Sequence, residues 1–158
     1  SKDDGLSFGE HDLNRGRPRR AAPTVRSMLI DSHAHIDGVE FDADREEVIE
    51  RASAAGVTTI LNVGTGDPHS GAFERAIELG RKHPNVYMAG DAYAPKHWPQ
   101  QAVHYANTYG QDKFLFGTDW SVIDPERAMS EVLDLNFRPE PLRKIVRDNA
   151  MRIFNLKG

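Results

Sequence analysis

Short apolar runs alternate with amphipathic stretches from Met28 to the end of the chain, and this alternation limits the fold more than any other feature. The apolar runs predict strands at 28–31, 58–63, 86–89 and 114–116. The amphipathic stretches predict helices at 42–56, 70–83, 99–109, 125–135 and 139–154. Because strands that alternate with helices build parallel sheets, we expect an α/β fold.

The length of the chain limits how far this sheet can extend. A complete eight-stranded α/β barrel takes about 250 residues and rarely fewer than about 200, whereas this chain has 158. Four strand–helix units and one extra C-terminal helix therefore predict a partial, half TIM-barrel-like (βα)4 domain over residues 28–158. A small open α/β sheet is the alternative arrangement of the same units.

Residues 1–27 show neither a strand nor a helix period, and we expect them to form a disordered basic tail. No apolar segment follows the arginines of this tail, so it does not have the pattern of a secretory signal. The net charge of −4 makes nucleic acid an unexpected partner. Binding of nucleic acid through the arginine-rich segment 15–20 is the alternative that this tail leaves open.

Composition excludes two further classes of protein. No run approaches the roughly 18 apolar residues of a membrane span, so we expect no membrane contact. The chain contains no cysteine, which excludes disulfides and thiolate metal sites and fits a cytoplasmic location. Any metal ion would be held by histidine and carboxylate ligands.

Two local patterns mark helix starts. Asp44 and Glu47 have the three-residue spacing of a capping box before the first amphipathic stretch. Asp124 stands directly before Pro125, as an N-cap residue stands before a proline in the first helical position. We therefore expect helices to begin at both places.

Two histidines stand at the end of the first predicted strand. His33 and His35 alternate with other residues, so both imidazoles project from one face of the strand. A pair of imidazoles suits zinc, and this pattern predicts a metal site, with two surface histidines as the alternative. Asp31 has the same parity, and it either orients an imidazole or caps a turn.

A carboxylate stands beyond the fourth predicted strand. Asp119 follows the apolar run 114–116 by three residues, and Asp124 already supplies the next helix start. In α/β proteins, reactive groups lie just past the carboxyl ends of strands. We therefore expect Asp119 to bind the same ion and to accept a proton from its water as the catalytic base.

The segment after the third predicted strand carries three further candidates. Lys96, His97 and Trp98 could contact a substrate, although a proline-bracketed aromatic segment is also typical of simple packing. His69 follows Gly64 and Gly66, but this Gly-x-Gly lacks the third glycine of a dinucleotide-binding motif. We rank His69 below the other three.

Several motifs together point to a known superfamily. The segments 28–37, 40–45 and 59–64 resemble the opening of TatD-type metal-dependent hydrolases, and 92–98, 114–120 and 148–154 resemble the closing third of amidohydrolase-related enzymes, which include decarboxylases and lactonases. The resemblance implies His33 and His35 as first-strand metal ligands and Asp119 as the last-strand aspartate that binds and activates water. The family's ligands from the fourth, fifth and sixth strands have no counterpart here.

The expected function is therefore a metal-dependent hydrolase of the amidohydrolase superfamily. It would use one divalent ion, zinc first and manganese or iron as alternatives, against a small-molecule ester, amide, lactone or phosphodiester. Two other functions remain open: a non-catalytic truncated barrel that binds or self-associates, and a metal-dependent decarboxylase. Because a short parallel sheet leaves unpaired edges, a homodimer is the expected assembly, with a monomeric sheet as its alternative.

Overall fold

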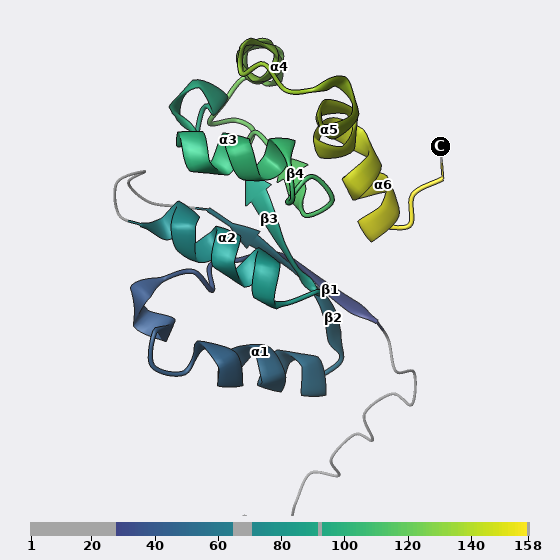
Figure 1. The fold of residues 1–158 in the computed structure, drawn as a ribbon. Helices are drawn as coiled ribbons and strands as arrows, with labels where there is room; N and C mark the ends of the chain where they lie inside the picture. Colours follow the sequence, from purple (N-terminus) through teal and green to yellow (C-terminus); the bar gives the residue numbers. More distant parts are fainter. Residues whose placement is uncertain (1–27, 65–70, 92, 158) are drawn as a thin grey trace, which may run out of the picture.

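The computed structural model describes residues 28–64, 71–91 and 93–157. The predicted tail at 1–27 and the weak candidate His69 lie outside the described residues. The chain forms one parallel sheet with strands β1 (Leu29–Ala34), β2 (Val57–Val63), β3 (Val86–Gly90) and β4 (Phe114–Phe116). Their order in space is their order in sequence, β1-β2-β3-β4 (Figure 1).

The helices follow the strands as the alternation predicted. They are α1 (Arg45–Ala54), α2 (Ala72–Lys82), α3 (Gln100–Asn107), α4 (Pro125–Asp134) and a C-terminal run of α5 (Pro139–Arg143), η3 (Lys144–Asp148) and α6 (Asn149–Ile153). Two short 3-10 turns, η1 (Val39–Phe41) and η2 (Pro95–His97), lie in the connections. Four parallel strands that alternate with helices in so short a chain confirm the prediction of a partial barrel.

The boundaries differ from the prediction in two places. β1 continues to Ala34, so His33 lies within the strand and not beyond it. The predicted helix at 139–154 is one run whose middle, η3, has π-helical hydrogen bonding. A π segment inserts one residue into a turn, which shifts the faces of the helix on either side of it.

One of the two predicted helix caps forms. Asp124 Oδ1 accepts a hydrogen bond from the Arg127 backbone nitrogen at 3.0 Å, and α4 begins at the following proline. The capping box of Asp44 and Glu47 is wrong, because Asp44 makes no side-chain cap bond. Both carboxylates instead approach the Arg51 guanidinium, at 3.4 Å and 3.7 Å.

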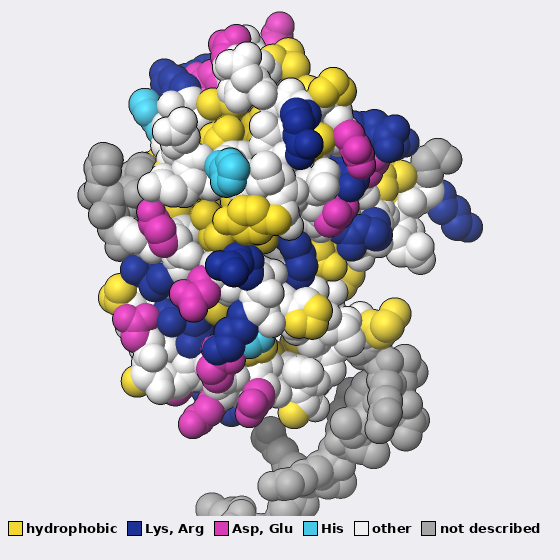
Figure 2. Space-filling view, in the orientation of Figure 1, with side chains coloured by type: hydrophobic (Ala, Val, Ile, Leu, Met, Phe, Trp, Pro, Cys, Tyr) yellow, Lys and Arg dark blue, Asp and Glu magenta, His cyan; other side chains and the backbone are white. Residues whose placement is uncertain are grey.

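The hydrophobic core lies between the sheet and its helices. Its larger cluster gathers around Met88 and Phe114, and its smaller cluster around Ile60 and Val86. The register pairs Ile60 with Val86 and Met88 with Phe114, so these four side chains share the helix-covered face of the sheet. Acidic and basic side chains gather over α1 and α2 in the lower part of the face shown in Figure 2.

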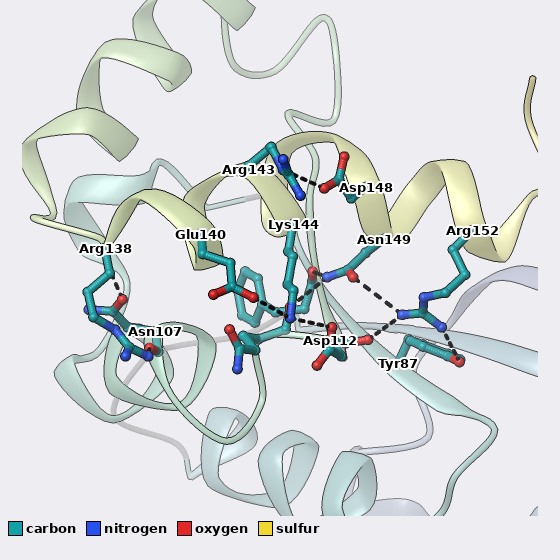
Figure 3. A network of polar contacts seen from close by, with 12 residues as sticks. Tyr87, Asn107, Asp112, Arg138, Glu140, Arg143, Lys144, Asp148, Asn149 and Arg152 are labelled. Atoms are coloured by element: carbon teal, nitrogen blue, oxygen red, sulfur yellow. Dashed lines mark hydrogen bonds and ion pairs between the residues drawn. The ribbon is translucent and has the colours of Figure 1, made fainter. Parts of the chain in front are cut away.

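The two edge strands of the sheet, β4 and β1, differ in how they are covered by the rest of the chain. At β4, the Asn149 side chain donates hydrogen bonds to the Phe114 and Gln111 carbonyls at 2.7 and 2.8 Å, and Asn149 is buried. The Phe114 carbonyl points away from β3, because the Lys113 carbonyl before it accepts from Met88 and successive carbonyls alternate. Figure 3 shows Asn149 within a polar network that ties the C-terminal helices to this edge.

The opposite edge is open among the described residues. Five of the six residues of β1 are exposed, and Leu29 and Ile30 keep 45% and 38% of their surface accessible. β1 pairs with β2 alone. Parallel strands are normally buried on both sides, so an exposed apolar β1 is an unfinished sheet edge.

The described helices contain none with the length and apolar character that a membrane crossing requires.

Candidate metal centre

His33 and His35 meet at the carboxyl end of β1. Their Nε2 atoms are hydrogen-bonded to one another at 3.1 Å, and their rings stand nearly perpendicular with centroids 4.9 Å apart. His35 Nδ1 lies 3.0 Å from the Val63 carbonyl oxygen of β2. A carbonyl can only accept, so His35 Nδ1 carries the proton and its Nε2 keeps a lone pair. The strand parity predicted from the sequence therefore brings the two imidazoles together.

This geometry fits a divalent metal ion. Two nitrogen ligands of a tetrahedral zinc ion, each at about 2.0–2.1 Å, lie roughly 3.3 Å from one another, close to the observed 3.1 Å. The bond from His35 to the Val63 carbonyl is the kind of support that fixes the tautomer and orientation of a ligating histidine. His33 and His35 could thus hold such an ion through their Nε2 atoms.

Behind the histidines lies a buried polar pair that sequence reasoning did not single out. Asp37 and Asn62 are 2% and 0% exposed, and Asn62 Nδ2 donates to Asp37 Oδ1 at 2.9 Å. Burial raises the pKa of Asp37, and the hydrogen bond from Asn62 opposes that rise. Arg75 Nε donates to the Asp37 carbonyl at 2.7 Å, so the turn after His35 is fixed to both β2 and α2.

Asp31 serves the backbone of this strand. Its Oδ1 atom accepts a hydrogen bond from the His33 backbone nitrogen at 3.1 Å. That bond fixes the backbone that carries His33, so of the two interpretations from sequence, orienting an imidazole or capping a turn, it corresponds to the second. Asp31 itself is exposed.

Asp119 lies at the opposite edge of the sheet from the histidines. It follows β4, which occupies the edge opposite β1, and its side chain is exposed. Its backbone has φ of 50°, and its carbonyl accepts from the Val122 nitrogen at 2.7 Å. Within the described ranges, no three His, Asp or Glu side chains lie close enough to hold an ion together.

Asp91 is the carboxylate that sequence reasoning missed. It directly follows β3, and its Oδ1 atom is buried with no hydrogen-bond partner in the described part of the chain. Burial raises the pKa of Asp91 and the Asp119 carboxylate raises it further, whereas a backbone hydrogen bond, His33 and His35 lower it. Asp91 therefore lies within electrostatic reach of all three predicted ligands. Its position directly after an apolar run could have identified Asp91 from the sequence, because the same feature identified Asp119.

The three candidates after β3 have separate environments. Lys96 lies 3.8 Å from the Glu131 carboxylate of α4, and His97 is exposed. Trp98 is 5% exposed, donates from Nε1 to the Tyr93 carbonyl at 3.1 Å, and packs edge-on against Phe114 in the larger core cluster. Trp98 therefore has the environment of a packing residue, which was the alternative interpretation of this segment.

One known protein family matches most of this chain in sequence. The sequence pattern of the amidohydrolase family matches residues 55–156, which is most of the described chain. This chain belongs to the amidohydrolase family. The match to that amidohydrolase pattern includes Asp91 and Asp119, and it begins after His33 and His35.

Relatives of this amidohydrolase-family chain are named as metal-dependent hydrolases or deoxyribonucleases. It is 50% identical over 52 residues to an uncharacterized metal-dependent hydrolase of Geobacillus stearothermophilus, covering 33% of this chain and 100% of that relative. It is 42% identical over 62 residues to the uncharacterized metal-dependent hydrolase YabD of Bacillus subtilis, covering 39% of this chain and 23% of that one. A putative deoxyribonuclease, tatdn3 of Danio rerio, is 31% identical over 88 residues, or 56% and 32% of the two chains.

The second and third of these relatives extend well beyond the matched segment. The chain spans about a quarter of YabD and a third of tatdn3. It is therefore homologous to metal-dependent hydrolases over part of a barrel, and the four-stranded sheet is the structural form of that part.

Proposed function

We propose that this chain is a metal-dependent hydrolase in which His33 and His35 hold one divalent ion through their Nε2 atoms. Zinc is the first choice because imidazole suits it, and manganese and iron are the alternatives. The observation that carries the proposal is the 3.1 Å separation of the two Nε2 atoms, with His35 Nδ1 already engaged by the Val63 carbonyl.

The residues of this chain have different proposed roles in hydrolysis. A divalent ion supplies Lewis acidity and makes water a better nucleophile near neutral pH. His35, fixed by Val63, keeps its lone pair toward His33, and Asp31 fixes the backbone that carries His33. Asp119, exposed at the mouth of the sheet, is the proposed base that accepts a proton from water.

The proposed substrate is a small molecule with an ester, amide, lactone or phosphodiester bond. The names of the relatives favour the phosphodiester, because tatdn3 of Danio rerio and TATDN3 of Homo sapiens are named as deoxyribonucleases. Chromogenic p-nitrophenyl esters and bis(p-nitrophenyl) phosphate distinguish these classes with one colour readout.

The metal assignment is tested by metal content after exhaustive dialysis. We expect about one equivalent of zinc in the full chain and none in the double variant His33→Ala/His35→Ala. His104→Ala is the matched control, because it removes an imidazole from α3, remote from the pair, and should keep the ion. Stoichiometric zinc in the double variant would show that the ion is held elsewhere and would overturn the proposal.

A second candidate function is a non-catalytic module that binds or self-associates. One observation favours it: β1 and β4 are opposite edges, so the sheet does not bring Asp119 beside the histidines as a closed barrel would. For such a module, both chromogenic substrates should stay intact with zinc, manganese or iron present. Hydrolysis that is lost in Asp119→Asn would instead support the enzyme.

A further inference from the structure

We propose that a cavity beside His35 binds an oxyanion group of the substrate, a phosphate or a carboxylate, and that Arg75 is the residue that selects it. This inference rests on the proposed function and narrows its substrates to those that carry a negative charge. Three observations carry it: the cavity is lined by both His35 and Arg75, one of its walls is held rigid, and the Arg75 guanidinium group is anchored.

The cavity lies between the segment that follows β1 and the start of α2, and its volume is about 310 Å³. Small-molecule sites have volumes of about 300–1,000 Å³. Its lining comes from the segment 35–40 on one side and from Ala72 and Arg75 of α2 on the other. Figure 1 shows the connection between β1 and α1 beside the start of α2. A substrate at the His33/His35 pair would therefore have this cavity next to it.

Two arginines hold the wall after β1 through three successive carbonyl groups. Arg45 donates to the Ile36 carbonyl at 2.7 Å and to the Gly38 carbonyl at 2.6 Å. Arg75 Nε donates to the Asp37 carbonyl, which lies between these two in sequence, at 2.7 Å. Hydrogen bonds from a charged donor are stronger than neutral ones. This wall is therefore preorganised, which lowers the cost of binding a ligand against it.

The guanidinium group of Arg75 has a fixed place in the cavity. Its Nε atom is held by the Asp37 carbonyl, and a Cβ atom placed on Gly71 would lie 3.2 Å from its Nη1 atom. The group therefore lies against the turn on one side and against the residue before α2 on the other. A planar guanidinium group carries five N–H donors, and its geometry matches that of phosphate and carboxylate. Because this side chain is already ordered, it loses little further entropy when it binds an anion.

A carboxylate in the same cavity limits its affinity for an anion. Glu40 is part of the lining, and a Cβ atom placed on Gly38 would overlap the Glu40 carboxylate, so this group lies against the turn. Like charges repel each other across such short distances. Removal of the Glu40 charge should therefore strengthen anion binding, whereas removal of the Arg75 charge should weaken it. A purely structural role of Arg75 would not produce these opposite effects.

The test follows the binding of inorganic phosphate to the metal-free full chain by ¹H–¹⁵N NMR at constant ionic strength. Metal-free protein is used because a bound ion would itself attract phosphate. We expect saturable shifts of the Gly38, Val39 and Ala72 amide signals. Arg75→Gln should bind phosphate about tenfold more weakly than the original chain. Glu40→Gln should bind it about threefold more tightly.

The matched controls remove the same charges outside the described lining of the cavity. Arg81→Gln and Glu50→Gln change exposed side chains of α2 and α1, and both should bind phosphate like the original chain. Glu40 is also exposed, so Glu40→Gln tests the cavity even where Arg75→Gln does not fold. A parallel titration with acetate identifies the anion: tighter binding of acetate than of phosphate assigns the cavity to carboxylates, and the reverse assigns it to phosphates.

The outcomes separate this inference from the proposed function. If Arg75→Gln binds phosphate as well as Arg81→Gln does, or if Glu40→Gln binds it no more tightly, the inference is overturned whatever the histidines bind. If both charge effects appear and the histidines hold no ion, the anion site stands and the hydrolase proposal fails. If the histidines do hold an ion, metal-loaded Arg75→Gln should have a higher KM for anionic bis(p-nitrophenyl) phosphate and an unchanged KM for neutral p-nitrophenyl acetate.

Discussion

The hydroxyl group of Tyr105 is buried and has no hydrogen-bond partner within the described residues. Burial raises the pKa of Tyr105 to about 12, above its ordinary value of 10. Between pH 10 and 12 the unfolded chain therefore loses this proton while the folded chain keeps it. By linkage, the stability that this group contributes falls as pH rises through that window.

We expect Tyr105→Phe to remove that pH dependence. The free energy of unfolding of the original chain should fall by about 1–2 kcal/mol more than that of the variant between pH 9.5 and 11.5. Urea unfolding followed by circular dichroism at several pH values measures the difference. Parallel curves for the two proteins would show that Tyr105 ionises as freely when folded as when unfolded.

Some residues of the candidate site could be predicted from the sequence alone, and others could not. His33 and His35 were predictable because their alternation fixes both rings on one strand face, and the structure brings their nitrogens to 3.1 Å. Asp91 was overlooked because its environment depends on a close approach to Gly117, which follows β4, and on a buried oxygen that has no hydrogen-bond partner in the described residues, and neither is a property of the local sequence. The core position of Trp98 likewise depends on Phe114, a partner 16 residues away.

At the scale of elements, α2 and α3 approach each other closely at Gly80 and Tyr105. A Cβ atom on Gly80 would lie 2.7 Å from the Tyr105 hydroxyl oxygen but 3.7 Å from the ring carbon that carries it. Gly80 sits inside α2, where glycine is about 1 kcal/mol less favourable than alanine. The hydroxyl group is therefore what requires glycine at this position.

A double-mutant cycle tests this coupling. Gly80→Ala alone should lower the free energy of unfolding by about 1–2 kcal/mol through steric overlap. In the Tyr105→Phe background, the same change should raise it by about 0.5–1 kcal/mol, because alanine favours the helix. Equal effects of Gly80→Ala in both backgrounds would show that the hydroxyl group is not the source of the conflict.

Asn149 joins the C-terminal helices to β4 by hydrogen bonds. We expect Asn149→Ala to destabilise the fold by about 2–4 kcal/mol, because it removes the two hydrogen bonds that Nδ2 donates and the one that Oδ1 accepts from Arg152, and leaves the buried Phe114 carbonyl unpaired. Thermal melting measures the loss, with Arg147→Ala as a control from an exposed side chain of the same run. A similar melting temperature for both variants would mean that water replaces Asn149 without cost.

Sequence periodicity predicted the strands and α-helices of the described residues, but not the 3-10 turns η1 and η2 or the finer geometry of the helices. The apolar runs identify the strands because parallel strands are buried on both faces. The π segment at 144–148 and the failed capping box at Asp44 depend instead on side-chain contacts, such as the pairing of Asp44 with Arg51. The alternative helix types and helix caps differ by small free energies, and the helix propensities of single residues do not resolve such differences.

At the scale of the whole molecule, length and strand count indicated a partial barrel, and the sheet confirms it. The number of strands does not determine how far apart the two edge strands, β1 and β4, lie. A resemblance to complete barrels places the first and last strands side by side, whereas the open sheet separates them by two strands. This is why Asp119 was predictable as a strand-end carboxylate although its separation from His33 was not.

We expect the chain to form a homodimer through β1. Its exposed apolar edge offers unpaired backbone groups that a second copy can satisfy. Light scattering coupled to size exclusion should give about twice the 17.7 kDa chain mass at tens of micromolar. A mass near that of one chain would contradict the dimer.

A charge on the edge strand should break this association. Ile30→Lys should shift the mass toward that of one chain, because an exposed lysine on an edge strand opposes pairing. Leu133→Lys is the control, since it places the same charge on an exposed apolar position of α4, away from β1. If both variants stay dimeric, the contact does not involve β1.

Asn149 occupies the outward carbonyl of Phe114, and the C-terminal helices that it anchors pack against β4, so β1 is the more accessible of the two sheet edges. A sheet with two open edges can add copies without limit and grow into a filament, as head-to-tail contacts do. A sheet with one open edge can only be matched by the same edge of another copy, and growth then stops at two. We therefore expect the asparagine that anchors the last helix also to limit assembly to two copies.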